Sequence, residues 1–517
     1  MEALSFNVAD LLDGWASKRG WKEAVVDLEE GRSVTYAELS QYSSELAAGL
    51  LKLGLRKGDR VAVLMENSPA LLEVFYACSK AGLVFTPLSF RWSLHELEAA
   101  LKHCSPRALI GDEDLLASMG LEAARRAGVG YVACTKPPRH LDTPHYAELR
   151  TRRGEVEVEL GPEDPHALLY TAGTMGRPKA CLLPYRKTFF NVLNDQLAFS
   201  LGEADRALCA LPLFHSGGLF IQAVPTLSTG GTLLLMKRVR GDAERLLSYM
   251  EDAQATWFLG VAYHAKLIAS HERAAQRFKL ESMRFWAFGG EPIPCSVIAR
   301  LQEKWPHIAV AFCYGSTETS LTVALPPSRR RVDSYRLVAK TGRTPAGWPM
   351  YFCQVKLSED GELLVRGPVV FKEYLGNPEA SAKAFDEEGW YRTGDLAVVD
   401  EEGLIYVVDR VSNVIKSGGE KILASEVEEA LLSHPAVEEA VVIGVADEKW
   451  GERPVALVAL RKGSHATPDE LRKHCLERLA KFKTPDAIII VDELPRSGPS
   501  KVSRAQLREL LERRLKP

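Results

Sequence analysis

The stretch ALLYTAGTMGRPKACLLPYR, residues 167–186, places glycines, threonines and a lysine directly after a short apolar run. Glycines let backbone N–H groups approach an anionic oxygen, hydroxyls donate hydrogen bonds to it, and lysine adds positive charge. Pro178 before the lysine and Ala180 after it exclude the pattern G-x-x-x-x-G-K-[ST] of P-loop nucleoside triphosphatases. The stretch therefore predicts a phosphate-binding loop of another kind. Its candidate contacts are Thr171, Gly173, Thr174, Gly176 and Lys179.

The bulk composition is that of a globular protein with more than one structural unit. At 517 residues the chain is too long for a single ordinary core, and 46% of its residues are hydrophobic and 26% charged. The formal net charge of -3 gives no general attraction to nucleic acid. We therefore expect no nucleic-acid partner.

Cysteine usage and the N-terminal sequence indicate the cytoplasm. The nine cysteines are an odd number without a C-x-x-C pair, which argues against a zinc site and a disulfide framework and for a reducing compartment. The first residues, MEALSFNVADLLDGW, are acidic and lack the pattern of a signal peptide. No apolar run approaches the length of a bilayer span. We expect a cytoplasmic protein without an integral membrane segment.

Short apolar runs alternate with segments of helical periodicity through the first three hundred residues. This rhythm predicts α/β layering, with helices packed on sheets. The predicted strands cover residues 61–65, 84–89, 107–112, 231–236, 255–260 and 284–290. Later residues are richer in β-signals, and residues 396–409 predict a hairpin that turns at Glu401, Glu402 and Gly403.

The character of the sequence changes again near Asp409. Residues 425–437 predict a helix with Ser425 and Glu428 at the spacing of a capping box. Strands at 437–445 and 453–460 and a helix at 469–482 complete a small α+β unit. Because no low-complexity linker precedes it, we expect a hinge at residue 409 rather than a tether.

Four further motifs accompany the glycine-rich loop. They are YGSTET (314–319), YRTGDL (391–396), DRVSNVIKSGGEKI (409–422) and PRSGPSKVSR (495–504). In this order the motifs resemble those of the adenylate-forming superfamily, which includes acyl-CoA synthetases, stand-alone adenylation domains and firefly luciferase. The resemblance implies a large N-terminal multi-sheet α/β domain, residues 1–408, and a small mobile α+β C-terminal domain, residues 409–517. It also implies an enzyme, an acid:CoA ligase that uses ATP, Mg²⁺ and CoA.

The resemblance assigns a nucleotide site to this chain. Tyr314 would stack on adenine, and Asp395 would bind the ribose diol with Arg410 as its partner. Besides the glycine-rich loop, the nucleotide pocket would be lined by Gly289, Gly290, Glu291 and Gly315. A turn-capping role for Asp395 is the structural rival of this assignment.

The resemblance also assigns residues to the chemistry. Glu318 would meet the magnesium ion, and Thr317 would contact phosphate beside it. Lys501 would bridge the acyl carboxylate and the α-phosphate during adenylation, and His215 would lie beside the acyl carboxylate. The rival interpretations are a helix N-terminal carboxylate for Glu318, a solvated surface lysine for Lys501 and a core histidine for His215.

The small domain would serve the second half-reaction. Gly418 and Gly419 would line the pantetheine tunnel, and Asp409 would be the hinge residue. A thiol attacks the adenylate only after adenylation is complete, so the two steps need different surroundings and a domain that moves. The sequence ends shortly after Lys501 without a carrier-protein domain, which favours free CoA as acceptor. A homodimer stays open.

Several positions depart from the family pattern. Ala172, Met175 and Ala180 stand where small polar residues or glycine are usual, Pro184 and Tyr185 replace a common Thr-His pair, and Ser500 stands where glycine precedes the late lysine. Each lost hydroxyl donor would cost about 1–3 kcal/mol if the phosphate stayed underpaired. We interpret the loop as a working but atypical site. The alternative is an enzyme with impaired adenylation that thioesterifies supplied acyl-adenylates or loads a separate carrier protein.

A non-catalytic nucleotide or acyl-CoA binding protein is a third hypothesis. It is disfavoured because a pure binder needs no mobile lysine such as Lys501. The acid would lie among residues 214–219, 258–264, 287–291 and 313–319, which hold aromatic and small residues and no arginine or lysine. This composition predicts a hydrophobic monocarboxylic acid, fatty or aromatic, as substrate.

Overall fold

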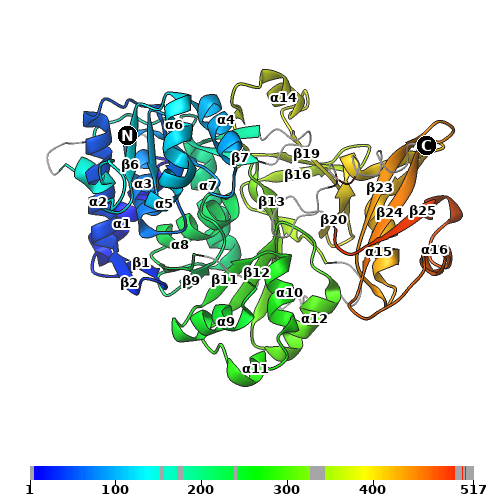
Figure 1. Ribbon diagram of the computed structural model, residues 1–517. Coiled ribbons are helices and arrows are strands. Elements are labelled where there is room, and N and C mark those ends of the chain that lie inside the picture. The colour runs from blue at the N-terminus through cyan, green and yellow to red at the C-terminus, as the bar shows by residue number, and fades with distance from the viewer. Residues whose placement is uncertain are drawn as a thin grey trace.

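The computed structural model describes residues 5–151, 156–171, 179–237, 241–325 and 344–494, together with Arg504 and Leu507 (Figure 1). Within these ranges the strands form four sheets. The strands predicted from the alternating pattern are confirmed to within about two residues at each end. The chain is therefore of the α/β class that its sequence predicts.

The largest sheet has nine strands in the order β15-β14-β13-β12-β11-β9-β10-β1-β2. The strands from β13 to β1 run parallel, and their apolar side chains are covered on both faces, as expected of a parallel sheet. The bounds are β1 Glu23–Asp27, β2 Arg32–Thr35, β9 Arg206–Cys209, β10 Thr232–Leu235, β11 Trp257–Gly260, β12 Phe285–Gly289, β13 Ala309–Ser316, β14 Ser320–Leu325 and β15 Trp348–Pro349.

A second sheet has seven strands in the order β18-β8-β7-β4-β3-β5-β6. Its bounds are β3 Arg60–Leu64, β4 Val84–Pro87, β5 Ala108–Gly111, β6 Tyr131–Cys134, β7 Pro165–Thr171, β8 Lys179–Pro184 and β18 Glu373–Tyr374. The short strand β18 comes from far along the chain and pairs antiparallel with β8. This pairing brings a late segment next to the strands that flank the glycine-rich loop.

Helices α3 and α7 lie between the two large sheets. α3, Pro69–Ala81, contacts β4 of the seven-stranded sheet and β1 of the nine-stranded sheet. α7, Tyr185–Phe199, contacts β7 and β8 on one side and β14 on the other. The remaining helices of this region are α1 Val8–Arg19, α2 Tyr36–Lys52, α4 Leu94–Cys104, α5 Glu113–Leu115, α6 Leu121–Ala127, α8 Val224–Ser228, α9 Ala243–Asp252, α10 Ala262–Ser270, α11 Ala274–Arg277, α12 Cys295–Lys304 and α14 Pro378–Lys383.

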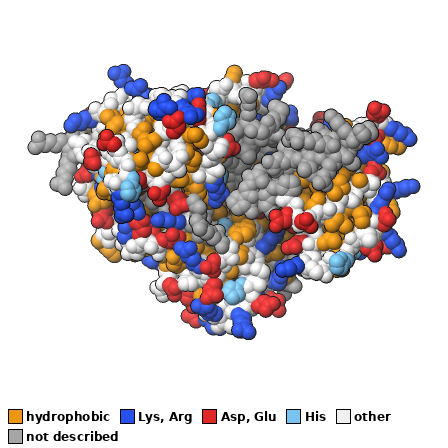
Figure 2. Space-filling model, viewed as in Figure 1, with side chains coloured by type: hydrophobic (Ala, Val, Ile, Leu, Met, Phe, Trp, Pro, Cys, Tyr) orange, Lys and Arg blue, Asp and Glu red, His pale blue; other side chains and the backbone are white. Residues whose placement is uncertain are grey.

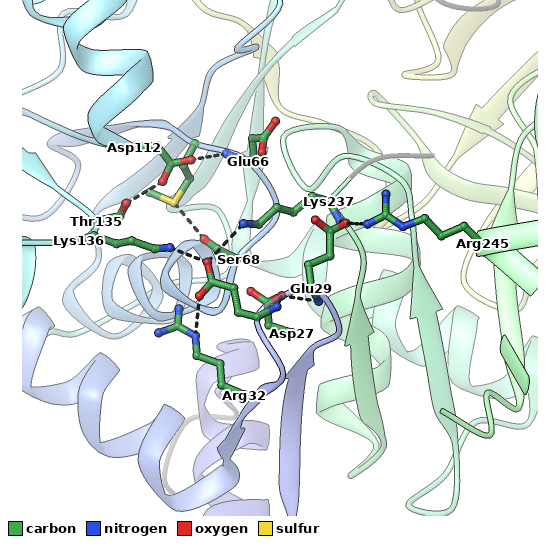
Figure 3. Close-up of polar contacts among 12 residues, drawn as sticks. Asp27, Glu29, Arg32, Glu66, Ser68, Asp112, Thr135, Lys136, Lys237 and Arg245 are labelled. Carbon is green, nitrogen blue, oxygen red and sulfur yellow. Dashed lines mark hydrogen bonds and ion pairs between the residues drawn. The ribbon is translucent and has the colours of Figure 1, made fainter. Parts of the chain in front are cut away.

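Charged side chains also join the two sheets at the ends of their strands (Figure 3). Glu30 follows β1 and pairs with Lys136, which follows β6, and with Lys237, which follows β10. Glu29 pairs with Arg245 at 2.9 Å. The hydrogen bond from Lys136 is the main cause that lowers the pKa of Glu30. These contacts fix the relative position of the two sheets that enclose α3 and α7.

A four-stranded antiparallel sheet follows, with β16 Gln354–Leu357, β17 Glu362–Arg366, β19 Tyr391–Val399 and β20 Ile405–Arg410. β19 and β20 pair antiparallel, which confirms the hairpin predicted for residues 396–409. The last sheet holds β21 Val414–Ser417, β22 Glu420–Leu423, β23 Val437–Asp447, β24 Gly451–Leu460 and β25 Ala487–Val491, covered by α15 Ala424–Leu432 and α16 Pro468–Leu476. Figure 1 shows this last sheet beside β20, at the end of the molecule opposite the N-terminus.

Three predictions about these helices are wrong. Ser425 does not cap α15, because the helix already begins at Ala424 and the Ser425 N–H donates instead to Asp409 Oδ2 at 2.8 Å. The helix ends at Leu432 and not at residue 437, since Pro435 lacks the N–H that would continue it. α16 ends at Leu476 and not at residue 482, because the chain tightens into a turn in which Arg478 N–H donates to the Cys475 carbonyl, three residues back, at 3.0 Å.

The visible surface carries charges of both signs. Figure 2 shows Lys and Arg side chains interspersed with Asp and Glu over this face rather than gathered in one patch. In the described ranges, every helix is too short or too polar to cross a bilayer.

Candidate active site

Tyr314, Asp395 and Arg410 meet where the nine-stranded sheet approaches the four-stranded sheet. The Tyr314 hydroxyl donates to Asp395 Oδ2 at 2.7 Å, and Arg410 Nε lies 3.0 Å from Asp395 Oδ1. Asp395 and Arg410 face each other in the register of β19 and β20. Burial and the Asp395 charge raise the pKa of the Tyr314 hydroxyl well above its usual value. The structure therefore brings together the three side chains that the sequence assigned to adenosine.

Glu318 and Thr317 lie in the tight turn between β13 and β14. Gly315 is required there, since a Cβ at this position would lie 1.8 Å from the Ser320 carbonyl oxygen. Ser320 closes the turn with a φ of 55°, in the left-handed region that residues other than glycine rarely adopt. The turn holds the Glu318 side chain 9% exposed, while Thr317 is half-buried.

The Glu318 carboxylate is held by a residue that the sequence did not reveal. The Tyr374 hydroxyl in β18 donates to Glu318 Oε1 at 3.0 Å, and the Glu318 backbone carbonyl accepts from Phe371 N at 2.7 Å. Lys179 Nζ lies 4.6 Å from the centroid of the Tyr374 ring, within cation–π distance. Tyr374 thus links the predicted metal-binding carboxylate to the lysine at the end of the phosphate loop.

Thr171 and Lys179 stand at the two ends of the glycine-rich loop. They face each other in the register of β7 and β8, and both are half-buried. The Thr171 hydroxyl donates to the Lys179 carbonyl at 3.4 Å. The predicted site residues Gly173, Thr174, Gly176 and Lys501 lie outside the described residues.

Two of the departures from the family pattern serve packing. Ala180 is buried in the apolar cluster that contains Leu168 and Cys104. Tyr185 begins α7, stacks on His166 with ring centroids 4.3 Å apart, and donates its hydroxyl to the Ser79 carbonyl at 2.8 Å. These substitutions therefore contribute to the core beside the loop.

Glycines line the carboxyl edge of strands β11, β12 and β13. Because neighbouring parallel strands end at one edge, the residues that follow them lie close together there. A Cβ at Gly289 would lie 2.7 Å from the Cys313 carbonyl oxygen, and Gly290 has a φ of 85°. Both positions therefore require glycine, whereas the neighbouring Glu291 is exposed.

His215 lies beside Phe214 at the start of the segment that precedes α8. The two rings are 4.2 Å apart between centroids. The side chain is exposed, yet the surrounding protein and the charge of Arg91 lower the pKa of its imidazole to about 4. The Arg91 guanidinium lies 5.9 Å from the centroid of the Phe214 ring. The segments assigned to the acid hold no cation of their own, but the fold places Arg91 next to one of them.

Asp409 joins β20 to the last sheet. Its Oδ1 accepts from Arg410 N at 2.7 Å and from Asn413 Nδ2 at 2.9 Å, while Oδ2 accepts from Ser425 N at the start of α15. A carboxylate at a helix N-terminus is favoured by the helix dipole. Gly418 and Gly419, with φ of 59° and 87°, form the two-residue turn between β21 and β22.

Two family models match this chain. A model described as AMP-binding enzyme matches residues 12–375, and one described as AMP-binding enzyme C-terminal domain matches residues 426–501. The chain belongs to the AMP-binding enzyme family. The resemblance inferred from the motifs is thereby confirmed, and so is the fold class.

Relatives of the whole chain agree with this assignment. A feruloyl-CoA synthase from Amycolatopsis sp is 36% identical over 493 residues, which cover 92% of this chain and 94% of that protein. A 2-succinylbenzoate–CoA ligase from Bacillus cereus (strain Q1) is 30% identical over 521 residues, 97% of this chain and 99% of the ligase. The crystal structure of ATP-bound MatB from Rhodopseudomonas palustris superposes with a TM-score of 0.88 at 28% identity, over 98% of this chain and 100% of MatB.

This member of the AMP-binding enzyme family is thus an acyl-CoA synthetase, which joins an acid to CoA through an acyl-adenylate. Sequence reasoning missed Tyr374 and Arg91 as neighbours of the site. Tyr374 sits in a two-residue strand whose pairing with β8 is long-range, and Arg91 follows a buried strand in a different sheet. The sequence around Tyr374 and Arg91 carries no local motif that would have revealed these two residues as neighbours of the site.

Proposed function

We propose that this acyl-CoA synthetase is an Mg²⁺-dependent ligase for a hydrophobic monocarboxylic acid, aromatic or fatty. The observation that carries the proposal is the convergence of Tyr314, Asp395 and Arg410 beside the turn that presents Glu318. The aromatic ring of Phe214 beside His215 supports an apolar acid. The relatives named feruloyl-CoA synthase and indoleacetate–CoA ligase, after aromatic monocarboxylic acids, support it as well. 2-Succinylbenzoate is an aromatic dicarboxylate, so the ligase named for it supports only the aromatic part of the proposal.

Two steps make up the proposed reaction. A carboxylate oxygen attacks the α-phosphorus of ATP, the bond to the β-phosphate oxygen breaks, and acyl-AMP and pyrophosphate result. The CoA thiol then attacks the acyl carbon, AMP leaves with the shared oxygen, and the thiol proton is released to solvent. Asp395 would hold the ribose, with Arg410 as its partner in the adenylation step, and His215, neutral at pH 7 because its pKa is lowered to about 4, would accept a hydrogen bond or donate one beside the acyl carboxylate.

The residues at the β13–β14 turn fit a magnesium ion. Mg²⁺ binds through one or two carboxylates and the phosphates of a nucleotide rather than in a cage of protein ligands. Glu318 offers one such carboxylate. Thr317, the residue before it, and Thr171, at the end of β7, offer hydroxyl oxygens. In keeping with this, no group of three or more His, Cys, Asp or Glu that could hold a metal occurs in the described residues. When bound, the ion would offset the charge that develops on the phosphates.

We further propose that residues 409–517 turn about Asp409 between the two steps, with residues 1–408 holding the substrates. Asp409 pairs with Leu396 in the larger domain, and its carboxylate accepts from Ser425 N in the smaller one, which supports a hinge at this residue. Lys501 would stabilise the adenylation transition state, and Gly418 and Gly419 would face CoA in the second step. The space beside Gly419 is open and leaves room for a narrow ligand, whereas the Trp450 ring packs against Gly418.

The experiment is product analysis by mass spectrometry. The protein is incubated with ATP, Mg²⁺ and a panel of aromatic, fatty and dicarboxylic acids, with and without CoA. We expect acyl-CoA from an apolar monocarboxylate only when CoA is present. A strong preference for a dicarboxylate would contradict the substrate class and would point to Arg91 as the partner of the second carboxylate.

A matched variant separates the two half-reactions. Lys501→Ala should abolish formation of acyl-adenylate from ATP and leave thioester formation from supplied acyl-adenylate intact, whereas the exposed Lys462→Ala should change neither.

The alternative function is thioester formation from supplied acyl-adenylates, with free CoA or a carrier protein as acceptor. The observation that favours it is the loss of hydroxyls at Ala172 and Met175. Under this alternative, Ala172→Ser with Met175→Thr should raise the rate of adenylation at least about tenfold, which corresponds to about 1.4 kcal/mol. No gain in rate would count against it.

A further inference from the structure

The buried side of α7 carries polar and charged side chains. Lys187 is 2% exposed, and Asn191 and Asp195 are fully buried. A lysine is almost never fully buried unless it has a partner, since the charge loses its hydration. Here burial lowers the pKa of Lys187 to about 7, and the nearby Glu318 carboxylate opposes that shift. The position of this amine therefore needs a reason other than packing.

The partner of Lys187 is the residue that closes the β13–β14 turn. Lys187 Nζ donates to the hydroxyl of Ser320. Ser320 is itself 2% exposed and has a φ of 55°. A residue other than glycine in this region costs about 1–3 kcal/mol and persists only where its surroundings hold it. Lys187 supplies a contact that holds it.

The next residue of β14 is held by the same helix. Asn191 Oδ1 accepts from Leu321 N at 3.2 Å, one helical turn after Lys187. On the other side of the turn, the Ser320 carbonyl lies directly over Gly315, where a Cβ would collide with it at 1.8 Å. The backbone at Ser320 is thus fixed from both sides, and the Glu318 carboxylate is presented only two residues away.

We propose that Lys187 is a positioning residue for the nucleotide and its metal ion: by holding Ser320 it fixes the turn that presents Glu318. The inference rests on the proposed role of Glu318 in meeting the Mg²⁺ of Mg–ATP. Lys187 itself touches neither substrate nor metal. Its effect should therefore appear in how much Mg²⁺ strengthens nucleotide binding, and not in the chemistry of the thiol step.

The test compares Lys187→Met, which keeps the length of the side chain but removes the donor and the charge, with the wild type. Isothermal titration with a non-hydrolysable ATP analogue, in Mg²⁺ and again in EDTA, gives the gain in affinity that the metal provides. We expect Lys187→Met to reduce this gain at least about fivefold and to leave affinity in EDTA within about twofold. The exposed Lys102→Met on α4 is the matched control and should leave both values unchanged.

A second substitution tests the mechanism. Glycine adopts a positive φ without help, so Lys187→Met combined with Ser320→Gly should recover the Mg²⁺-dependent gain to within about twofold of the wild type. Ser320→Ala, which keeps the lysine but removes its acceptor, should show the loss on its own. This variant also answers the question if Lys187→Met does not fold.

The outcomes separate this inference from the proposed function. If the wild type gains no affinity from Mg²⁺, the role of Glu318 fails and the inference fails with it. If the wild type shows the gain and Lys187→Met and Ser320→Ala retain it, only the positioning role of Lys187 is overturned. A loss in Lys187→Met that is equally large in EDTA, or that Ser320→Gly does not recover, would also overturn it and would mark Lys187 as structural.

Discussion

Helices α3 and α7 occupy equivalent places between the two large sheets, but they bury different chemistry. α3 buries apolar residues such as Leu72 and Phe75, and its buried carboxylate, Glu73, accepts a hydrogen bond from Tyr146 at 2.7 Å and pairs with Arg150. α7 buries Lys187, Asn191 and Asp195 in a row that faces β14 and the segment before α8. The same layer of the fold thus has an apolar half and a polar half.

The difference shows what each helix contributes. Burying a polar group costs free energy unless all of its hydrogen bonds are formed, and Asp195 Oδ1 has no hydrogen-bond partner in the described residues. A helix that only packed would therefore be more stable with apolar residues at these positions. α3 contributes stability alone, whereas α7 gives up stability in order to hold the strand that leads to Glu318.

The largest effect on stability should come from the apolar half. Phe75 is fully buried and lies within 6 Å of the rings of Phe85 and Phe220, measured between centroids. Phe75→Ala should reduce the free energy of unfolding by about 3–5 kcal/mol. At urea concentrations at which the variant is still folded, its KM for ATP should equal that of the wild type. Urea denaturation and initial-rate kinetics measure the two quantities, and a changed KM would break the distinction between the helices.

Truncating a buried side chain of α7 should lower stability and also weaken ATP binding, unlike the truncation of Phe75 on α3. Asn191→Ala removes the acceptor of the Leu321 N–H and the donor to the Phe220 carbonyl and to Asp195 Oδ2, all of them buried. We expect the free energy of unfolding to fall by about 2–4 kcal/mol. Because β14 is no longer held, the KM for ATP should also rise. Leu197→Ala, on the exposed side of the same helix, is the control for both measurements and should change neither. An unchanged KM in Asn191→Ala would reduce the polar half to a structural role.

The contribution of the polar helix α7 to stability should depend on pH through Asp195. Burial raises the pKa of Asp195 well above its ordinary value of 3.8, against the opposing influence of Asn191 and Lys187. The native state therefore binds the proton more tightly than the unfolded state. Its contribution to stability is complete below pH 3.8 and is lost as the pH rises toward the native pKa, by up to about 1.4 kcal/mol per pH unit.

Asp195→Asn should remove that loss. Relative to the wild type, the variant should gain stability as the pH rises above 4, in urea denaturation measured from pH 5 to pH 8. The exposed Asp252→Asn is the matched control. A constant difference between Asp195→Asn and the wild type would show that Asp195 is ionised in the native protein.

The contrast between the helices also explains which features the sequence could predict. Strands β3, β4, β5, β10, β11 and β12 follow from apolar runs, and Tyr314, Asp395 and Arg410 lie in short motifs that carry their own context. Along α7, Lys187 and Asn191 are four residues apart, a spacing that predicts a solvent-exposed face. The face becomes buried because β14 of the nine-stranded sheet, from residues beyond 300, packs against it.

The capping of α15 shows the same limit on a smaller scale. Ser425 has the local spacing of a cap, but the carboxylate of Asp409 reaches the helix N-terminus from the preceding strand and takes its place. Such a contact depends on how the chain crosses from β20 to the last sheet, which local spacing does not encode.

The smallest effects should come from His166, which bridges the two helices. The Ser79 hydroxyl on α3 donates to the Phe75 carbonyl at 3.0 Å, so it accepts from His166 Nε2, 2.6 Å away. His166 Nδ1 then accepts from the Thr188 hydroxyl on α7 at 3.0 Å. Burial lowers the pKa of this imidazole to about 3, and it stays neutral at pH 5 and above.

Ser79→Ala and Thr188→Val should therefore each lower the free energy of unfolding by about 1 kcal/mol, equally at pH 5.5 and pH 8. Both should leave the KM for ATP unchanged, because the hydrogen bonds of the two hydroxyls go to His166 and α3 rather than to β14. A rise in KM for Thr188→Val alone would extend the functional half of the layer to the side of α7 that His166 contacts. Urea denaturation at both pH values together with ATP kinetics distinguishes the two cases.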